Sequence, residues 1–394
     1  MVSNFGAGWP GALLHVIASR RIPFYPLQRT RLEPRRGSRA KLAKPRAMKP
    51  RRSLWSCAAL ACAVLLLRPG TTAAAAARRF EPDDVQRVVG LTSPQISPDG
   101  THAIVIVSST ELYYRLPRGG APVALKNYNK AIAALALGGS ETVTFRSDTG
   151  TLADAVLITP PDFSPSKTYP LVLLIHGGPT SATTHTFNRL GQLMAARGWL
   201  VLEPNYRGSD NHGLAYQRAV RYDPEDGPGR DVDAAVAAVR TRGIVDSDRI
   251  AVSGWSYGGI MTAWMVTHYH YWKAAVSGAS VNDWSTDYSV ADDSDSDAAL
   301  FHSGPWAGPD AWAEYDRASA VTYAKNVTTS VLILGDVGDN RDPIATSCEF
   351  YHALKDNGKD VTFVAWPVAG HFPRDPVRSL DVYEHWIDFI AAHF

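Results

Sequence analysis

The sequence has little cysteine, and most of it lies in one short stretch. Among 394 residues there are three cysteines, Cys57, Cys62 and Cys348, and the first two lie in an apolar run near the N-terminus. If that run is removed, the single remaining cysteine forms no internal disulfide, which excludes a disulfide-stapled fold. No spacing of Cys, His, Asp or Glu resembles a metal or cofactor motif. We therefore expect neither a metal nor a cofactor.

Clusters of positive charge are missing from most of the chain. Residues 1–79 hold 16 of the 40 Lys and Arg residues and a single acid, a net charge of +15, whereas residues 80–394 carry −13. Nucleic-acid-binding domains present basic patches, so we expect no nucleic-acid partner. A nucleic-acid-binding arm is the alternative interpretation of the basic N-terminal tract. The apolar fraction of 45% fits a globular protein and excludes wholesale disorder.

A hydrophobic run long enough to span a membrane is also missing near the N-terminus. The uncharged run Leu54 to Leu67 has 14 residues, whereas a membrane span needs about 20. It follows the basic residues 49–52 and precedes the small residues Ala73 to Ala77, which is the order of a secretory signal peptide. We predict a signal peptide over residues 48–77, export to the periplasm or medium, and no stable span after cleavage. A buried core helix is the alternative.

The signal-like segment begins at residue 48 instead of residue 1. Because signal peptides stand at the N-terminus, we predict that Met48 is the true start. Residues 1–47 are then a basic upstream extension, either disordered or wrongly assigned to the chain. The other alternative is that the chain starts at Met1 and keeps this extension.

The rest of the chain divides into a β-rich segment, 78–150, and an alternating segment, 151–394. In the first, the turn residues 97–100 precede a predicted strand at 103–107, and a further strand is predicted at 142–145. In the second, apolar runs typical of buried parallel strands alternate with helical periodicity. The predicted strands are 156–159, 171–175, 200–203, 250–253, 274–277, 331–334 and 362–365, and the predicted helices are 186–197, 231–240, 260–268 and 381–393. This alternation predicts an α/β fold with a doubly wound, mostly parallel sheet.

One motif in the alternating segment carries chemistry. Gly254-Trp255-Ser256-Tyr257-Gly258 is a G-x-S-x-G sequence between a predicted strand and a predicted helix. This is the setting of the nucleophile elbow of α/β-hydrolases, where small residues two before and two after the serine allow a sharp turn. The pattern alone occurs by chance, but the strand-turn-helix context favours Ser256 as a nucleophile.

A serine nucleophile needs a base, an acid that orients the base, and donors for the oxyanion. His371 follows the last predicted strand and is the candidate base. Two acids follow the strand 331–334, Asp336 and Asp339, and spacing alone favours neither. The backbone N–H of Tyr257 and that of Gly178, in His176-Gly177-Gly178-Pro179, are the candidate oxyanion donors. A plain Gly-Pro turn is the alternative for that loop.

These residues together resemble the catalytic domain of the prolyl oligopeptidase family, in its acylaminoacyl-peptidase and dipeptidyl-peptidase branch. The resemblance covers roughly residues 151–394 and is carried by several segments together. They are Tyr169-Pro170-Leu171, His176-Gly177-Gly178-Pro179, Asn205-Tyr206-Arg207-Gly208-Ser209, Val245-Asp246, Arg249-Ile250, Gly254 to Gly259 and Gly370-His371. It implies an α/β-hydrolase fold and a serine peptidase.

The resemblance also bears on the acid and on the N-terminal segment. The family's D-x-R-x-P pattern matches Asp339 to Pro343 and selects Asp339 over Asp336, although Asp342 stands where an apolar residue is usual. Residues 91–100 look like the opening of the family's β-propeller. About 70 residues cannot hold several blades of 40–45 residues each. The resemblance therefore implies that 78–150 is a propeller remnant and that most of the propeller is missing.

Three functional readings follow. The first is a serine peptidase that cleaves short peptides through an acyl-enzyme, with peptides as partners. The second is an esterase that uses the same residues on small acyl esters. The third is an inactive fragment or a binding module. The segment Asp283 to Ala311 either lines the acyl pocket with its aromatic residues, Trp284, Tyr288, Phe301 and Trp306, or is an acidic surface loop; the sequence leaves this open.

Overall fold

The computed structural model describes residues 77–88, 95–96, 103–108, 111–115, 123–127 and 129–394. The upstream extension, the turn at 97–100 and the predicted signal peptide except its last residue lie outside these ranges. Nothing in the described residues tests the division into four segments, which stays a prediction. No helix in the described ranges is long and apolar enough to cross a membrane.

Four short strands near the N-terminus form a separate antiparallel sheet in the order β1-β2-β3-β4. The predicted strand at 103–107 corresponds to the second of them. Four antiparallel strands are the content of one propeller blade, and the assignment of this segment to a propeller stays a prediction. The strands are β1 (Gln95–Ile96), β2 (Ala103–Ser108), β3 (Glu111–Arg115) and β4 (Val123–Asn127).

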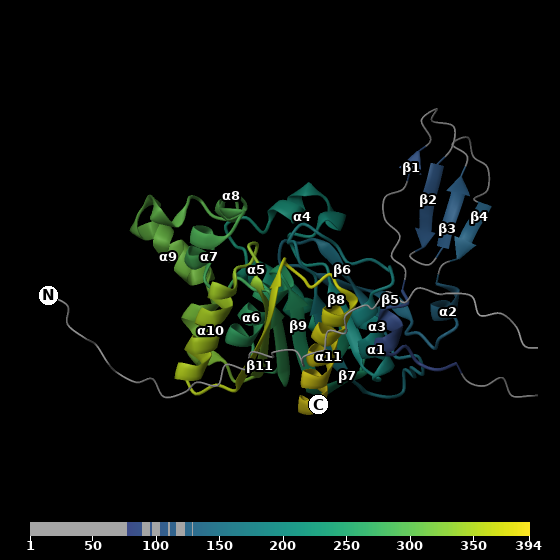
Figure 1. Ribbon diagram of the computed structural model, residues 1–394. Coiled ribbons are helices and arrows are strands. Elements are labelled where there is room, and N and C mark those ends of the chain that lie inside the picture. The colour runs from purple at the N-terminus through teal and green to yellow at the C-terminus, as the bar shows by residue number, and fades with distance from the viewer. Residues whose placement is uncertain (1–76, 89–94, 97–102, 109–110, 116–122, 128) are drawn as a thin grey trace, which may run out of the picture. The chain divides into compact units, whose positions relative to one another are not determined.

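The remaining strands form an eight-stranded sheet in the order β12-β11-β10-β9-β7-β8-β6-β5 (Figure 1). Neighbours from β12 to β8 run parallel, and β6 and β5 add an antiparallel edge. The predicted α/β fold is therefore confirmed. The strands are β5 (Ser140–Arg146), β6 (Leu152–Ile158), β7 (Tyr169–Ile175), β8 (Leu200–Pro204), β9 (Val245–Trp255), β10 (Ala274–Gly278), β11 (Ser330–Gly338) and β12 (Val361–Ala369).

Helices cover both faces of this sheet and form a hydrophobic core on each. Apolar residues of α5, α6 and α10 pack on one face, and those of α3 and α11 pack on the other. The larger helices are α3 (Arg189–Ala196), α5 (Asp226–Arg240), α6 (Tyr257–His268), α9 (Pro309–Ala318), α10 (Ile344–Asp356) and α11 (Pro376–His393). The shorter ones are α1 (Pro82–Val85), α2 (Lys130–Ala133), α4 (Leu214–Arg218), α7 (Trp284–Val290) and α8 (Ser294–Ala298). Short 3₁₀ helices lie at Asp210–His212, Pro305–Ala307 and Ala320–Asn326.

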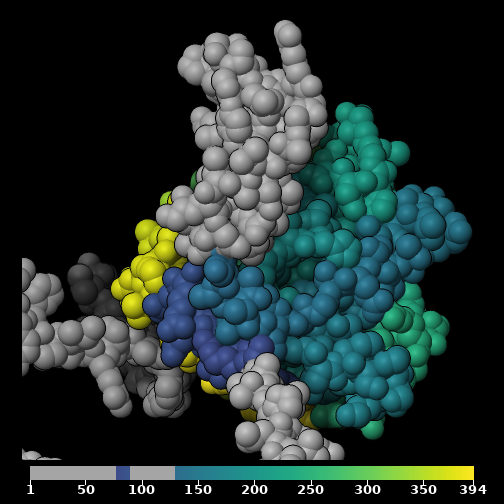
Figure 2. All heavy atoms as spheres, turned by 90° about the vertical axis from the view of Figure 1, so that its right-hand side faces the viewer, coloured from purple at the N-terminus to yellow at the C-terminus, as the bar shows by residue number. Residues whose placement is uncertain are grey.

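The eight-stranded sheet includes a strand that precedes residue 151 in the sequence. The strand predicted at 142–145 is β5, and it pairs along its whole length with β6. Phe80 is buried in the same core as α11 and meets Phe187 edge-on, with ring centroids 5.5 Å apart. Figure 2 shows the purple segment that contains α1 against the yellow helix α11. The eight-stranded sheet and its hydrophobic core thus include residues that precede residue 151.

The parallel register brings the functional segments to one edge. Ile175 of β7 aligns with Gly254 of β9, which aligns with Ser277 of β10, and Ser277 aligns with Ile333 of β11. Parallel strands aligned in this way end together, and ligands of open α/β sheets bind beyond their carboxyl ends. The segments after β7, β9, β11 and β12 therefore meet at this edge, and these are the segments that hold the candidate site residues.

Candidate active site

Ser256 occupies a strained turn between β9 and α6. Its backbone has φ 59° and ψ −130°, in the positive-φ region that L-residues rarely adopt. Its N–H donates to the carbonyl of Gly278 at 2.9 Å. This turn requires glycines around it, because a Cβ on Gly254 would lie 2.3 Å from the backbone of Gly258, and a Cβ on Gly258 would lie 2.0 Å from the carbonyl oxygen of Ile175. The G-x-S-x-G glycines thus permit the close approach of β9, α6 and β7.

Alanine at Gly258 is expected to lower the free energy of unfolding by about 3 kcal/mol, because its methyl group has no room and overpacking shifts the backbone. Gly335, on β11 near the same edge, is the matched control, since a Cβ there meets only the side chain of Ile344 at 3.9 Å. Denaturant unfolding of both variants measures the difference. A Gly258→Ala variant as stable as Gly335→Ala contradicts the close approach.

His371 and Asp339 form a hydrogen-bonded pair beyond β12 and β11. His371 Nδ1 lies 2.8 Å from Asp339 Oδ2. The other oxygen of Asp339 accepts from the N–H groups of Arg341 at 2.8 Å and Asp342 at 3.3 Å. The carbonyl of His371 accepts from Trp255 Nε1 at 2.7 Å, which ties the histidine to the residue before Ser256. Both oxygens of the Asp339 carboxylate therefore have defined partners, and the carboxylate fixes the Nδ1 edge of the His371 ring.

This pair has an electrostatic consequence for the histidine. Burial disfavours the imidazolium, but the hydrogen bond that Nδ1–H donates to Asp339 and the charges of Asp342 and Asp339 outweigh burial and raise the pKa of His371 above its usual value. His371 in this environment is a stronger base than a free imidazole, as a proton acceptor in catalysis requires.

Asp336, the competing acid, does not meet His371. Its side chain is fully buried in β11, and neither carboxyl oxygen receives a hydrogen bond from the described residues. Burial, then the charge of Asp339, raises the pKa of Asp336 to about 7. The structure thus brings Asp339 and not Asp336 to the histidine, in agreement with the choice that the family resemblance implied.

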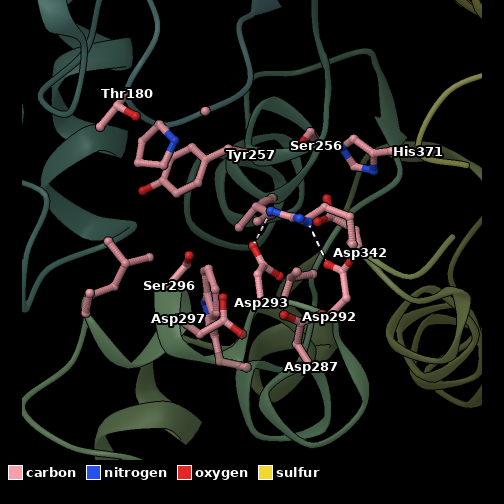
Figure 3. A pocket seen from close by; sticks show the side chains of 18 of the residues that line it. Thr180, Ser256, Tyr257, Asp287, Asp292, Asp293, Ser296, Asp297, Asp342 and His371 are labelled. Carbon is pink, nitrogen blue, oxygen red and sulfur yellow. Dashed lines mark hydrogen bonds and ion pairs between the residues drawn. The ribbon is translucent and has the colours of Figure 1, made fainter.

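Ser256, Tyr257, Gly178, Asp339 and His371 line one cavity of about 980 Å³. Figure 3 shows Ser256, Tyr257 and His371 at this cavity. No hydrogen bond joins the Ser256 hydroxyl to His371 within the part of the chain that the structure describes, and catalytic hydrogen bonds of this kind commonly tighten only with substrate. All five residues predicted from the sequence are therefore brought together. Their catalytic roles stay predictions.

The two candidate oxyanion donors flank the serine. Tyr257 is the first residue of α6, and the first N–H groups of a helix have no partner within it. The loop after β7 packs against the serine, because a Cβ on Gly177 would lie 3.2 Å from Ser256 Cβ. Gly178 has φ 133°, a conformation that glycine adopts without strain. Both residues line the cavity beside Ser256, and their role as oxyanion donors stays a prediction.

His176 is a positioning residue that sequence reasoning quoted in its motif without giving it a role. Its Nδ1 donates to the carbonyl of Gly177 at 2.8 Å, which leaves Nε2 to accept from the Ser209 hydroxyl at 2.9 Å. Burial lowers the pKa of His176 to about 4, so the ring is neutral. Tyr206 stacks on it and donates to its backbone carbonyl at 2.7 Å. These contacts hold the glycine loop beside Ser256.

The loop that supplies Tyr206 and Ser209 is itself held by a buried ion pair. Arg207 donates to both carboxylate oxygens of Asp231 at 2.9 Å, and its backbone N–H donates to the same group. Tyr216 also donates to Asp231, at 3.1 Å. A bidentate pair of this kind fixes the relative orientation of the two side chains and also stabilises the contact. The Asn205-Tyr206-Arg207-Gly208-Ser209 motif is therefore a scaffold for the glycine loop.

The segment from Asp283 to Ala311 lines the cavity chiefly through its polar residues. Of its four aromatic residues only Trp284 lines this cavity, whereas Tyr288 and Phe301 pack against Tyr315, and Trp306 is 67% exposed. The polar residues of this segment contribute more side chains to the cavity wall than its aromatic residues do. They are Asp287, Asp292, Asp293, Ser296 and Asp297. The acidic loop and the pocket wall, which the sequence left as alternatives, are the same feature.

No group of three His, Cys, Asp or Glu side chains in the described ranges is arranged to hold a metal ion.

Comparisons with known proteins match much of the chain and its fold. Residues 185–394 match the model of the prolyl oligopeptidase family. The chain is 32% identical over 313 residues to the uncharacterized peptidase YuxL of Bacillus subtilis, covering 76% of this chain and 47% of that protein. It is 26% identical over 292 residues to dipeptidyl-peptidase 5 of Porphyromonas gingivalis, covering 71% and 42%.

A solved structure shows the same likeness in three dimensions. Pyrococcus horikoshii acylaminoacyl peptidase aligns with a TM-score of 0.70 at 25% identity, over 76% of this chain and 49% of that one. The chain thus spans about half the length of the relatives that it matches.

Proposed function

Because the chain belongs to the prolyl oligopeptidase family, we propose that it is a serine peptidase that hydrolyses short peptides through an acyl-enzyme on Ser256. The observation that carries this proposal is the single cavity that holds Ser256, at a strained strand-helix turn, with His371, whose Nδ1 is held by Asp339. The relatives named above include peptidases. No cofactor enters the proposed reaction.

In the proposed reaction, Ser256 Oγ attacks the carbonyl carbon of the substrate, and His371 Nε2 takes the serine proton. Asp339 holds the imidazole with its proton on Nδ1, so that Nε2 is free to accept. The N–H groups of Tyr257 and Gly178 stabilise the oxyanion of the tetrahedral intermediate. His371 then returns the proton to the leaving amine, and water attacks the acyl-enzyme by the same route.

A fluorophosphonate probe is expected to label the full chain at one residue, Ser256, as measured by intact mass and by mapping of the modified peptide. Such probes react with activated serines because the oxyanion donors and the base assist the attack. Labelling elsewhere, or of no residue in a protein that melts cooperatively, contradicts the proposal and favours an inactive chain.

A peptide anilide and a p-nitrophenyl ester of the same acyl group separate peptidase from esterase. The proposal expects hydrolysis of both, since amide cleavage needs His371 to protonate the leaving amine and ester cleavage needs this less. Turnover of the ester alone removes the peptidase assignment and supports a carboxylesterase.

We also propose that the chain is exported. The basic residues after Met48, the 14-residue apolar run and the small residues that follow support a signal peptide over 48–77.

A further inference from the structure

Three buried carboxyl groups form one wall of the catalytic cavity. Asp287 of α7, Asp297 of α8 and Asp342 of the loop after β11 line it, and they are 1%, 6% and 7% exposed. We call these three residues the acidic wall. In Figure 3, Ser256 and His371 lie on one side of the cavity, and Asp287 and Asp297 lie on the other. The proposed reaction uses none of the three.

The acidic wall is short of hydrogen-bond donors. The carboxyl groups of Asp287 and Asp297 contact each other. Apart from that contact, one buried oxygen of Asp287, of Asp297 and of Asp342 receives no hydrogen bond from the described part of the chain. A buried polar atom without a partner costs about 1–3 kcal/mol. Such atoms in a cavity wall are therefore places where a ligand supplies the missing donor.

Within the part of the chain that the structure describes, no Lys or Arg forms an ion pair with the acidic wall. Arg341, the nearest arginine in sequence, is paired with Asp292 at 2.9 Å and Asp293 at 2.7 Å. Arg218 and Arg221 line the cavity from α4 and just beyond it, but they are exposed and form no ion pair with the wall. Burial accordingly raises the pKa of Asp287, which the nearby charge of Asp297 raises further, and burial raises the pKa of Asp342 to about 8. An incoming cation favours the ionised form of these groups.

One end of the acidic wall, Asp342, lies next to the residue that holds His371. The N–H of Asp342 donates to Asp339 Oδ1 at 3.3 Å, and the other oxygen of Asp339 holds His371. Apolar side chains, those of Ile260, Val281 and Trp284, line the same cavity. The aliphatic part of a lysine or arginine side chain packs on such apolar residues while its charged end extends to polar groups beyond them. The geometry thus fits the side chain of the residue whose carbonyl carbon Ser256 attacks.

We propose that the acidic wall binds the cationic side chain of a substrate arginine or lysine whose carbonyl Ser256 attacks. This inference rests on the proposed hydrolase function and adds its substrate class. An apolar side chain in this position leaves the buried carboxyl groups unpartnered, and sites with unpaired buried polar groups reject such substrates strongly. The departure at Asp342, an acid where the family usually has an apolar residue, then has a function.

The test compares N-acetylated aminomethylcoumarin substrates on the full wild-type chain. Arginine is compared with citrulline, which keeps the shape without the charge, and lysine is compared with norleucine. We expect kcat/KM to be at least about tenfold higher for each cationic substrate than for its neutral partner. A glutamate substrate measures the opposite preference, which Arg218 and Arg221 would cause. Equal rates for arginine and citrulline, or a preference for glutamate, overturn the proposal.

Asparagine variants locate the effect. Asp287→Asn and Asp342→Asn are each expected to lower the arginine-to-citrulline ratio of kcat/KM several-fold. Asp295→Asn is the matched control, because Asp295 lies on the same helix as Asp297, is exposed and does not line the cavity. It is expected to keep the wild-type ratio. A ratio that survives in both wall variants shows that these carboxyl groups do not select the side chain.

Labelling separates failure of this inference from failure of the proposed function. If the fluorophosphonate labels Ser256 but kcat/KM is the same for the arginine and citrulline substrates, only the acidic-wall proposal is refuted. If the folded chain is not labelled, the proposed hydrolase function itself is refuted. If a labelled chain turns over none of the substrates, acetyl-argininal is compared with the citrulline aldehyde as an inhibitor of labelling. At least about tenfold stronger protection by the arginine aldehyde supports the cationic site, and equal protection refutes it.

Discussion

Replacing Ser256 with alanine is expected to lower kcat for a peptide substrate by about 10⁶-fold, the loss found when a serine nucleophile is removed from a complete triad. The remaining residues still bind and polarise the carbonyl, but no acyl-enzyme forms. Stopped assays with high enzyme concentration measure the residual rate. The variant also fails to react with the fluorophosphonate, because the labelled hydroxyl is gone.

The control for this variant is Ser296→Ala. Ser296 lines the same cavity from α8 and has no part in the proposed reaction (Figure 3). It is expected to keep a kcat close to that of the wild type and full labelling. Alanine at 256 introduces no new backbone strain, since serine already adopts φ 59° there, so both variants are expected to melt at the wild-type temperature. If Ser256→Ala keeps more than a hundredth of the wild-type kcat, another nucleophile is responsible.

Asp339→Asn is expected to lower kcat by about 10⁴-fold. The amide no longer selects the tautomer with its proton on Nδ1, and it no longer stabilises the imidazolium that forms in the transition state. Asp336→Asn is the matched control three residues away. Its buried carboxyl makes no hydrogen bond with a described residue, so the neutral amide is expected to retain most of the wild-type kcat. Equal losses in the two variants contradict the assignment of the acid.

The pH dependence of kcat/KM gives a second readout of Asp339. The base must be neutral, so activity falls as the pH drops through the pKa of His371. Burial lowers this pKa, but the hydrogen bond that His371 donates to Asp339 outweighs burial, so the pKa is raised above the usual value of 6.5. We expect the acid limb of the wild-type profile to lie above pH 6.5. In Asp339→Asn the limb shifts to lower pH, because the contact that favours the imidazolium is lost. A limb that does not move shows that Asp339 does not act on the histidine.

The strands and the nucleophile turn were predictable because their signals are local. The runs 171–175, 250–253 and 331–334 lie within β7, β9 and β11, and the helix predicted at 260–268 is the later part of α6. A strand buried on both faces needs a continuous apolar run. A sharp turn needs glycine at fixed positions. The buried strands and the nucleophile turn can therefore both be predicted from residues that are neighbours in the sequence.

Helix starts and the edge of the sheet were less predictable. The helix predicted at 231–240 begins at Asp226 as α5, and it includes Gly227, Pro228 and Gly229. Such residues usually indicate a loop. Here a Cβ on Gly227 would lie 2.6 Å from Arg207 Nη1, and one on Gly229 would lie 3.0 Å from the Trp264 ring. The glycines are present because other segments pack closely against the first turn, which no local pattern contains.

The sequence by itself determined the order of strands and helices, the turn that exposes Ser256, and the presence of a histidine and two acids after the last strands. Periodicity, apolar runs and glycine spacing encode these features over a few residues. The tertiary structure showed the contact between His371 and Asp339, which residue spacing had left open and the family pattern had favoured. It alone decided that His176 holds the glycine loop and that Asp287, Asp297 and Asp342 share one cavity wall. These contacts join residues from different strands and helices, and their distances depend on how the elements pack. A carboxylate on a surface and one in a pocket have the same local sequence signal, and burial alone separates them.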